Sequence, residues 1–104
     1  MFKLTSNAAD QVRVASRMGG TEDMPLRLSV SQKPDGTIDY KMGFDEGSGD
    51  DLRVISENIE IIMSPEDSPL LDEAIMDYVE LDDGEHHFIF LNPKDSGYIA
   101  PKEN

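Results

Sequence analysis

Two adjacent histidines have the most versatile side-chain chemistry in this chain. His86 and His87 are its only imidazoles among 104 residues, and imidazole binds metal ions or titrates near neutral pH. Adjacent residues of a β-strand point to opposite faces of the sheet, so we expect one ring to face inward and the other to face solvent. This placement favours one packed or hydrogen-bonded histidine and one solvated histidine over a shared metal site, and it allows a small pH effect near about pH 6–7 from the inner ring.

Pairs of neighbouring carboxylates are a second group that could bind ions. Calcium and magnesium prefer oxygen ligands, but none of the pairs has the spacing of a calcium-binding loop. Surface charge is therefore favoured over a cation site. The pairs comprise Asp45, Glu46, Asp50, Asp51, Asp72, Glu73, Asp82 and Asp83.

The sequence contains no recognisable set of catalytic residues. The absence of cysteine excludes disulfides, thiolate-bound zinc and a cysteine nucleophile. A serine nucleophile would need a histidine and a third group to orient it, yet no Gly-x-Ser-x-Gly motif is present and both histidines fall within a predicted strand. We expect a protein that is not an enzyme, with no catalytic residues, no metal ligands and no cofactor.

Negative charge is concentrated in one part of the sequence. The formal net charge is −13, and residues 45–85 contain fifteen acidic residues and one basic residue, against five and six in residues 1–44. Such a field repels nucleic acid phosphates and anionic membranes and attracts basic protein surfaces. We expect no direct nucleic acid or membrane binding. The charge serves either solubility alone or the steering of a protein partner, with the eight paired acidic residues above as candidate contacts.

The N-terminal sequence MFKLTSNAAD has no apolar core of signal-peptide length, and no segment approaches the length of a membrane span. We expect a cytoplasmic protein.

Secondary-structure signals divide the chain into short elements. Thr5 or Ser6 can cap a helix that Gly19–Gly20 ends. Its apolar stripe is formed by Ala8, Val12 and Ala15, with Ala9 and Met18 beside it. A second, short helix is predicted at residues 70–74. Strands are predicted at residues 2–4, 26–31, 38–44, 52–55, 59–63, 75–81 and 86–91.

The strand pattern predicts mostly antiparallel pairing. Alternating apolar residues flank the turn at residues 33–36 and predict a hairpin. Met42, Met63 and Met76 lie in strand patterns and are expected to fill the core rather than bind metal. The order of elements predicts an α+β fold with a mostly antiparallel, sandwich-like sheet, one long N-terminal helix and one short helix. We expect one domain at residues 1–93 and a flexible C-terminal tail at 94–104.

Several segments together resemble the A-type iron–sulfur carrier family, the IscA, SufA and HesB type. The opening residues 4–9 resemble the entry into that family's first helix, and residues 26–44 resemble its strand pair. Residues 76–79 and 88–93 resemble its last two strands and the Asn-Pro that ends them. The resemblance extends from Leu4 to about Gly97 and implies a HesB/IscA-like fold.

This resemblance also assigns ligand positions. The family binds iron or a cluster through one cysteine after the first strand of the pair and a Cys-Gly-Cys in the tail. These positions fall on Asp35, Ser96 and Tyr98 here, so no thiolate is available. Cluster iron is held mainly by thiolate sulfur. We call these three the vacant ligand positions.

The resemblance implies a function without a cluster. Cysteine-free, stand-alone members of the family are associated with dissimilatory sulfur oxidation. We expect a non-catalytic protein-interaction or regulatory module, with a partner from sulfur oxidation or iron–sulfur assembly. The alternative is a carrier of iron or another metal that uses carboxylate and histidine ligands. Because tail cysteines help to hold the family's oligomers together, we expect a monomer.

Overall fold

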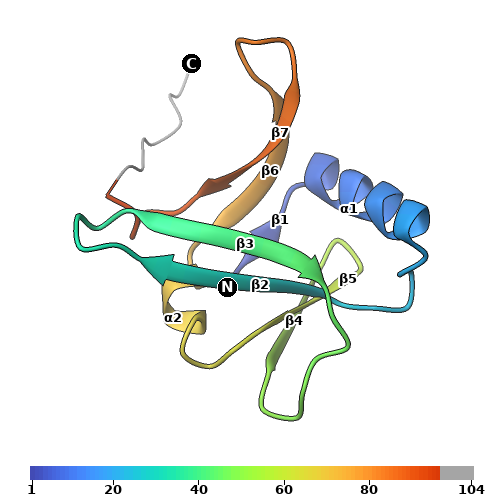
Figure 1. The fold of residues 1–104 in the computed structure, drawn as a ribbon, viewed down its shortest axis with the longest axis horizontal. Helices are drawn as coiled ribbons and strands as arrows, with labels where there is room; N and C mark the ends of the chain where they lie inside the picture. The colour runs from blue at the N-terminus through green and yellow to red at the C-terminus, as the bar shows by residue number, and fades with distance from the viewer. Residues whose placement is uncertain (97–104) are drawn as a thin grey trace.

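A computed structural model describes residues 1–96, and this part of the chain contains two helices and seven strands (Figure 1). The strands form two separate sheets, one of three strands and one of four, so the fold is mixed α+β. The elements are β1 (Lys3–Leu4), α1 (Ser6–Gly19), β2 (Leu26–Gln32), β3 (Ile38–Phe44), β4 (Leu52–Ser56), β5 (Ile59–Met63), α2 (Ser68–Leu71), β6 (Ile75–Glu80) and β7 (His86–Leu91).

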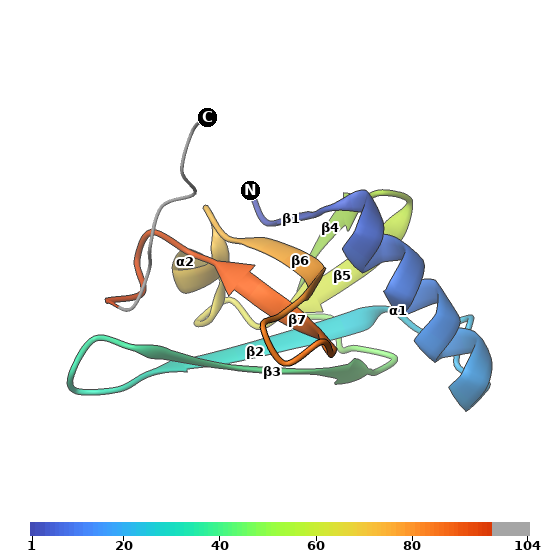
Figure 2. The same ribbon diagram turned by 90° about the horizontal axis from the view of Figure 1, so that it is seen from above.

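Helix α1 begins and ends at the residues that the sequence predicts. The Thr5 side chain accepts a hydrogen bond from the Ala8 amide at 3.1 Å, which caps the first turn. Gly20 adopts the left-handed conformation (φ 69°) at the other end. Ala8, Ala9 and Val12 are buried, whereas Met18 is 85% exposed because the last turn extends beyond the sheets (Figure 2).

The three-stranded sheet has the order β1-β6-β7. Strand β1 pairs in parallel with β6, and β6 pairs antiparallel with β7 along its full length. The turn between β6 and β7 contains Gly84 at φ +80°, a conformation that L side chains seldom adopt.

The four-stranded sheet has the order β3-β2-β5-β4. Its predicted hairpin is confirmed, since β2 and β3 pair antiparallel from Leu26↔Phe44 to Gln32↔Ile38. Strands β4 and β5 form a second hairpin, and β2 pairs briefly with β5 in parallel. The β4–β5 turn places Glu57 and Asn58 at positive φ, 52° and 64°.

One hydrophobic core joins the two sheets and α1. The rings of Tyr40 on β3 and Phe90 on β7 stack with centroids 4.1 Å apart, which connects the edges of the two sheets. Figure 2 shows β6 and β7 crossing the β2–β3 hairpin at an angle, with α1 at one end. The buried cluster comprises Phe2, Leu4, Ala8, Ala9, Val12, Leu26, Leu28, Ile61, Met63, Leu71, Ala74 and Met76.

Two sequence predictions need correction. The short helix lies at Ser68–Leu71 instead of 70–74, because Ala74 accepts a backbone hydrogen bond from Lys3 at the start of the β1–β6 pairing. Met63 and Met76 are buried as predicted, but Met42 is 40% exposed. It lies on β3 at the edge of its sheet, where no further strand covers it. No helix among residues 1–96 is long and apolar enough to cross a membrane.

Candidate functional site

The first vacant ligand position lies in the tight turn between β2 and β3. One oxygen of the Asp35 carboxylate accepts hydrogen bonds from the Thr37 amide at 2.9 Å and the Thr37 hydroxyl at 2.7 Å. These two bonds lower the pKa of Asp35, so the carboxylate form is favoured. The Asp35 side chain therefore stabilises its own turn.

The second vacant ligand position contacts the first. The Ser96 amide donates to the Gly36 carbonyl and the Ser96 hydroxyl to the Asp35 carbonyl, both at 3.1 Å. The approach is close, because a Cβ added to Gly36 would lie 3.0 Å from Cβ of Ser96. The structure thus brings together two predicted positions that are 61 residues apart. Tyr98, the third, lies outside the described residues.

The donors at this place do not fit an iron–sulfur cluster. Asp35 and Ser96 offer oxygen, whereas cluster iron is held by thiolate sulfur with occasional imidazole. The carboxylate of Asp35 accepts from Thr37, and the hydroxyl of Ser96 donates to the Asp35 carbonyl. The polar groups at the positions of the family's metal ligands therefore form hydrogen bonds within the protein.

The chain leading to Ser96 is attached at several points. The buried Asn92 side chain donates to the Leu70 carbonyl at 2.6 Å and accepts from the Lys94 amide at 3.1 Å. The Tyr40 hydroxyl donates to the Asp95 carboxylate at 3.4 Å, and partial burial raises the pKa of Tyr40. Because residues 97–104 lie outside the described part, the predicted boundary of a flexible tail at 94 stays a prediction.

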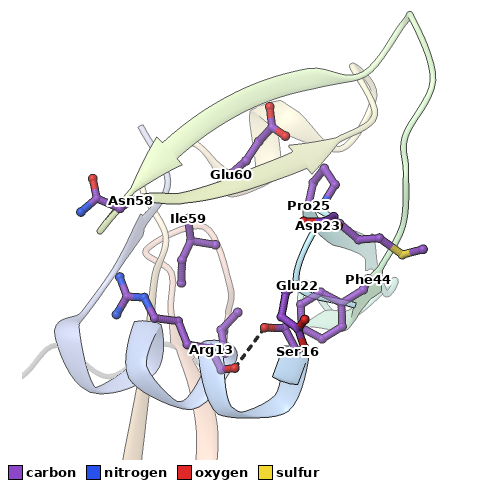
Figure 3. A pocket seen from close by; sticks show the side chains of 11 residues that line it. Arg13, Ser16, Glu22, Asp23, Pro25, Phe44, Asn58, Ile59 and Glu60 are labelled. Carbon is purple, nitrogen blue, oxygen red and sulfur yellow. Dashed lines mark hydrogen bonds between the residues drawn. The ribbon is translucent and has the colours of Figure 1, made fainter. Parts of the chain in front are cut away.

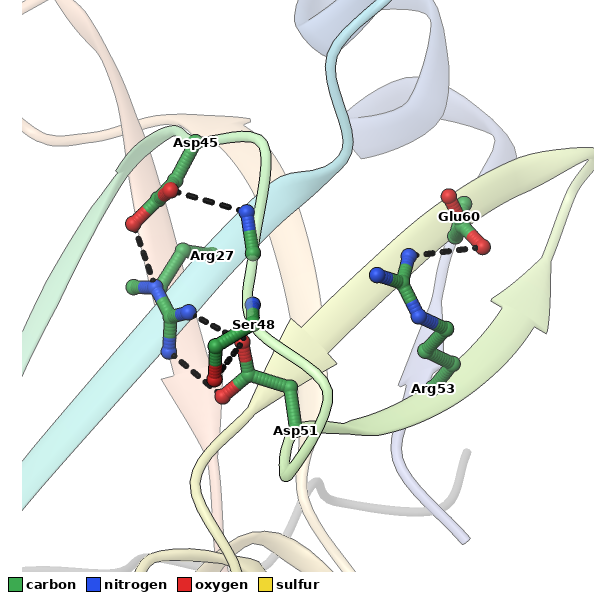
Figure 4. Close-up of polar contacts among 7 residues, drawn as sticks. Arg27, Asp45, Ser48, Asp51, Arg53 and Glu60 are labelled. Atoms are coloured by element: carbon green, nitrogen blue, oxygen red, sulfur yellow. Dashed lines mark hydrogen bonds and ion pairs between the residues drawn. The ribbon is translucent and has the colours of Figure 1, made fainter.

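Two of the candidate partner-contact residues belong to an internal charge cluster (Figure 4). The Arg27 guanidinium on β2 donates to Asp45 at 2.7 Å and makes a two-point contact with Asp51. The Asp51 side chain is only 5% exposed. The same carboxylates accept amide hydrogen bonds from Gly47 and Ser48. This Arg27 cluster therefore attaches the 45–51 loop to the sheet.

The charges of the Arg27 cluster stabilise one another. The hydrogen bonds that Arg27 donates to the carboxylates of Asp51 and Asp45 raise the pKa of Arg27 above its ordinary value. The hydrogen bond from Arg27 is the main cause that lowers the pKa of Asp51, whereas for Asp45 the Gly47 amide comes first and Arg27 second. The cluster is thus arranged to keep both carboxylates ionised.

The other candidate acidic residues are exposed at three places. Glu46 and Asp50 lie in the 45–51 loop, Asp72 and Glu73 follow α2, and Asp82 and Asp83 lie in the β6–β7 turn. Their assignment as partner contacts stays a prediction.

The histidine prediction is wrong in one respect, because both rings are exposed. His86 stacks on Tyr78 with ring centroids 5.5 Å apart, whereas the His87 Nε2 lies 3.5 Å from Asp83 and 3.7 Å from Glu85. Both histidines are at the exposed end of the β6–β7 hairpin, and partial burial on β7 begins only at Phe88.

A group of possible metal ligands lies at this hairpin end and was missed by the sequence analysis. One ligand atom from each of Asp83, Glu85 and His87 falls within 4.8 Å of the others. The signal was available in the sequence, because Asp83, Glu85 and His87 follow one another at a spacing of two residues across the predicted turn and into the strand.

A pocket between α1 and the β4–β5 turn was also missed (Figure 3). Its lining comes from four distant segments and includes Arg13 on the helix, Glu22, Phe44 and Ile59. No local pattern in the sequence marks it, because the pocket exists only once these segments are packed together.

Comparison with protein-family models and with curated proteins finds no match. Solved structures do match. The structure of IscA with the [2Fe-2S] cluster is 26% identical with a TM-score of 0.75, covering 89% of this chain and 86% of that one. Escherichia coli SufA, involved in the biosynthesis of iron–sulfur clusters, is 24% identical with a TM-score of 0.70 and the same coverages. A protein from Aquifex aeolicus solved by NMR is 26% identical with a TM-score of 0.66, covering 88% and 91%.

These similarities extend over most of each chain. The protein therefore has the fold of the A-type iron–sulfur carriers, and the resemblance inferred from the sequence is confirmed for the fold. It has this carrier-like scaffold without any cysteine.

Proposed function

We propose that this protein is a non-catalytic protein-interaction or regulatory module on an A-type carrier scaffold that has lost its cluster ligands. The observation that carries the proposal is the contact between Asp35 and Ser96. A hydrogen bond from the Ser96 hydroxyl to the Asp35 carbonyl joins the two positions there, and neither residue offers the sulfur that a cluster needs. The scaffold is retained, and we infer that its surface now serves to bind a protein partner.

The proposed partner acts in dissimilatory sulfur oxidation or in iron–sulfur assembly in the cytoplasm. The chain resembles the cysteine-free, stand-alone DsrR protein of sulfur-oxidising bacteria, which favours the first of these settings. The similarity to IscA and SufA favours the second. In either setting the protein would act by contact, as a monomer, and without direct contact with nucleic acid.

Electrostatics suggest the chemistry of that partner. With a net charge of −13, the protein should associate fastest with a basic surface. Asp45 and Asp51 already neutralise Arg27. Steering would therefore depend mainly on the exposed carboxylates outside that cluster, such as Glu46, Asp50, Glu73 and Asp82.

Affinity capture in the native host tests this function. The wild-type protein should capture proteins of sulfur oxidation or iron–sulfur assembly, and capture should weaken as salt rises to about 150 mM, where the screening length is roughly 8 Å. The Glu46→Gln/Asp50→Asn/Glu73→Gln/Asp82→Asn variant should capture less. Its control swaps the same residues between aspartate and glutamate, which keeps the charge. Captured proteins from unrelated processes would contradict the function, and equal capture by all three forms at every salt concentration would remove its electrostatic part.

A second candidate function is metal carriage at the β6–β7 hairpin. It is favoured by one observation, the proximity of Asp83, Glu85 and His87. Two carboxylates and an imidazole suit a first-row divalent metal such as ferrous iron or zinc better than calcium. The hairpin is exposed, so a bound metal could be passed to another protein.

Titration of the purified protein with ferrous iron or zinc separates the two functions. Metal carriage predicts saturable binding of one metal ion at micromolar concentration, abolished in His87→Ala and retained in His86→Ala. Uptake that does not saturate, or that both variants share equally, would dispose of the metal-carrier function.

A further inference from the structure

The pocket between α1 and the β4–β5 turn has a volume of about 280 Å³. That is slightly below the roughly 300–1,000 Å³ of small-molecule and cofactor sites. A single side chain is a better match to this size than a cofactor. Figure 3 shows the pocket opening between the helix and the hairpin, with polar groups around it.

Part of the pocket's lining is apolar. Val12 on α1 is 4% exposed, and Ile59 and Phe44 are half-buried members of the core's edge. In Figure 3 Phe44 and Ile59 both point into the space between the helix and the hairpin. An occupant with an apolar section would cover the exposed parts of Phe44 and Ile59 and gain from their burial.

The rim of the pocket is acidic. Glu22, Asp23 and Glu60 all line it and are exposed. Glu60 is paired with Arg53 at 3.1 Å. The Glu22 and Asp23 side chains, in contrast, make no hydrogen bond or ion pair within residues 1–96. These two carboxylates are free to meet a cation.

Among residues 1–96, Arg13 is the one basic residue that lines the pocket, and it is already paired. The Arg13 guanidinium contacts Asp10 at 3.0 Å and donates to the Glu57 carbonyl of the β4–β5 turn. In Figure 3 it lies at the Asn58 end, away from Glu22 and Asp23. Arg13 therefore fixes the helix to the turn as one wall of the pocket, and it leaves the charge of the opposite rim uncompensated.

We propose that this pocket receives a basic side chain of the protein partner, preferentially an arginine. Arginine combines an aliphatic stem, which would cover the exposed parts of Phe44 and Ile59, with a charged head that would reach Glu22 and Asp23. Its planar guanidinium forms two-point hydrogen bonds to carboxylates, which a lysine ammonium does not. The inference deepens the proposed interaction function and rests on it for the existence of a partner.

A second depression offers a natural comparison within the same molecule. It lies between α1 and the β6–β7 hairpin and is lined by Asp10, Glu80, Tyr78 and His86 among others. Asp10 there is already paired with Arg13, so a cation would gain less. An arginine probe should therefore prefer the pocket at the β4–β5 turn.

The test is an NMR titration of the ¹⁵N-labelled full chain with N-acetyl-arginine amide. We expect saturable shifts confined to residues 13–16, 22–25, 44 and 58–60, with a dissociation constant on the order of 1 mM. The lysine analogue should bind more weakly, and the citrulline analogue, which keeps the shape but has no charge, should not bind. Shifts centred on Glu80 and His86, or equal shifts with citrulline, would overturn the proposal.

Variants make the test specific. Glu22→Gln/Asp23→Asn should weaken arginine binding at least fivefold, whereas the charge-conserving Glu22→Asp/Asp23→Glu and the distant Glu73→Gln/Asp82→Asn should not. All these side chains are exposed, so an unchanged spectrum of the free variant confirms that the fold is intact. Equal binding by all the variants would contradict the assignment of Glu22 and Asp23.

Capture of the partner distinguishes this inference from the function on which it rests. If the Glu22→Gln/Asp23→Asn variant loses the captured partner, the pocket is its docking site. If capture remains complete and still depends on salt, the pocket inference fails while the interaction function stands.

Discussion

At the scale of single residues, the contact of Asp35, Gly36 and Ser96 determines what this scaffold can do. Asp35 and Ser96 are 61 residues apart, yet the hydroxyl of one donates to the backbone carbonyl of the other. Gly36, at φ +89°, makes room for that approach. The sequence and the family resemblance predicted that these positions are vacant, but the hydrogen bonds between them could be known only from the packed structure.

Alanine at Gly36 should separate the two vacant ligand positions. Gly36→Ala and Gly84→Ala both place a Cβ at positive φ, at a cost of about 1–2 kcal/mol, but only the first also meets Ser96, at 3.0 Å. We expect Gly36→Ala to reduce the free energy of unfolding more than Gly84→Ala does. It should also abolish hydrogen-exchange protection of the Ser96 amide. Equal protection of that amide in both variants would contradict the contact.

The Arg27 cluster should contribute to stability in a pH-dependent way. Arg27 and the loop amides lower the pKa values of Asp45 and Asp51 below the unfolded-state value of about 3.9. A lowered folded-state pKa gives stability that is complete above the unfolded-state pKa and is lost as pH falls through the folded-state pKa. Stability should therefore decrease on acidification below about pH 4.

Urea denaturation of Asp51→Asn measured as a function of pH checks this effect. The variant should be less stable at neutral pH and lose less stability between about pH 4 and 2 than the wild type. Asp50→Asn is the control, because Asp50 is adjacent and exposed but does not contact Arg27. If the free energy of unfolding fell equally with pH in the wild type and Asp51→Asn, the pairing would have no such role.

At the scale of elements, sequence patterns predicted the helix ends and the hairpin, which depend on neighbouring residues. Thr5 and Gly20 fix the ends of α1, and the alternation of apolar residues fixes the β2–β3 hairpin. Predictions failed where contacts between distant parts of the chain override the local sequence pattern. The Ala74 carbonyl takes part in the β1–β6 pairing, Met42 is exposed on the edge strand β3, and the start of β7 projects beyond the core with both histidines.

The β4–β5 turn offers a test at this scale. Glu57 and Asn58 are the two non-glycine residues at positive φ among residues 1–96, and a two-residue hairpin turn of this kind favours asparagine followed by glycine. Glu57→Asn should raise the free energy of unfolding by about 0.5–1 kcal/mol, because asparagine tolerates the left-handed conformation better.

Chemical denaturation measures the effect, with Glu46→Asn as the control. Glu46 is an exposed loop glutamate without positive φ, so its substitution changes the charge equally and leaves the strain unchanged. The interpretation would be wrong if both substitutions changed stability by the same amount. Because Arg13 binds the Glu57 carbonyl and not its side chain, the wall of the pocket should persist in Glu57→Asn.

At the scale of the whole molecule, the fold could be predicted from the sequence, whereas most of the candidate sites could not. The order and spacing of weak segments were enough to predict the carrier fold, and the structural similarity to IscA and SufA confirms it. The absence of cysteine from the composition was enough to exclude thiolate ligands. The pocket at α1 could not be predicted, because four distant segments form it. The group of Asp83, Glu85 and His87 was missed although its residues are spaced two apart in the sequence.

The most direct measurement is reconstitution with ferrous iron and sulfide without oxygen, followed by desalting and assay of iron and visible absorbance. The account predicts that the wild-type protein emerges colourless and free of iron and sulfide. The Asp35→Cys/Ser96→Cys/Tyr98→Cys variant, which restores sulfur at the vacant ligand positions, should retain a cluster. A wild-type protein that keeps a coloured cluster through desalting would contradict the claim that this carrier scaffold works without one.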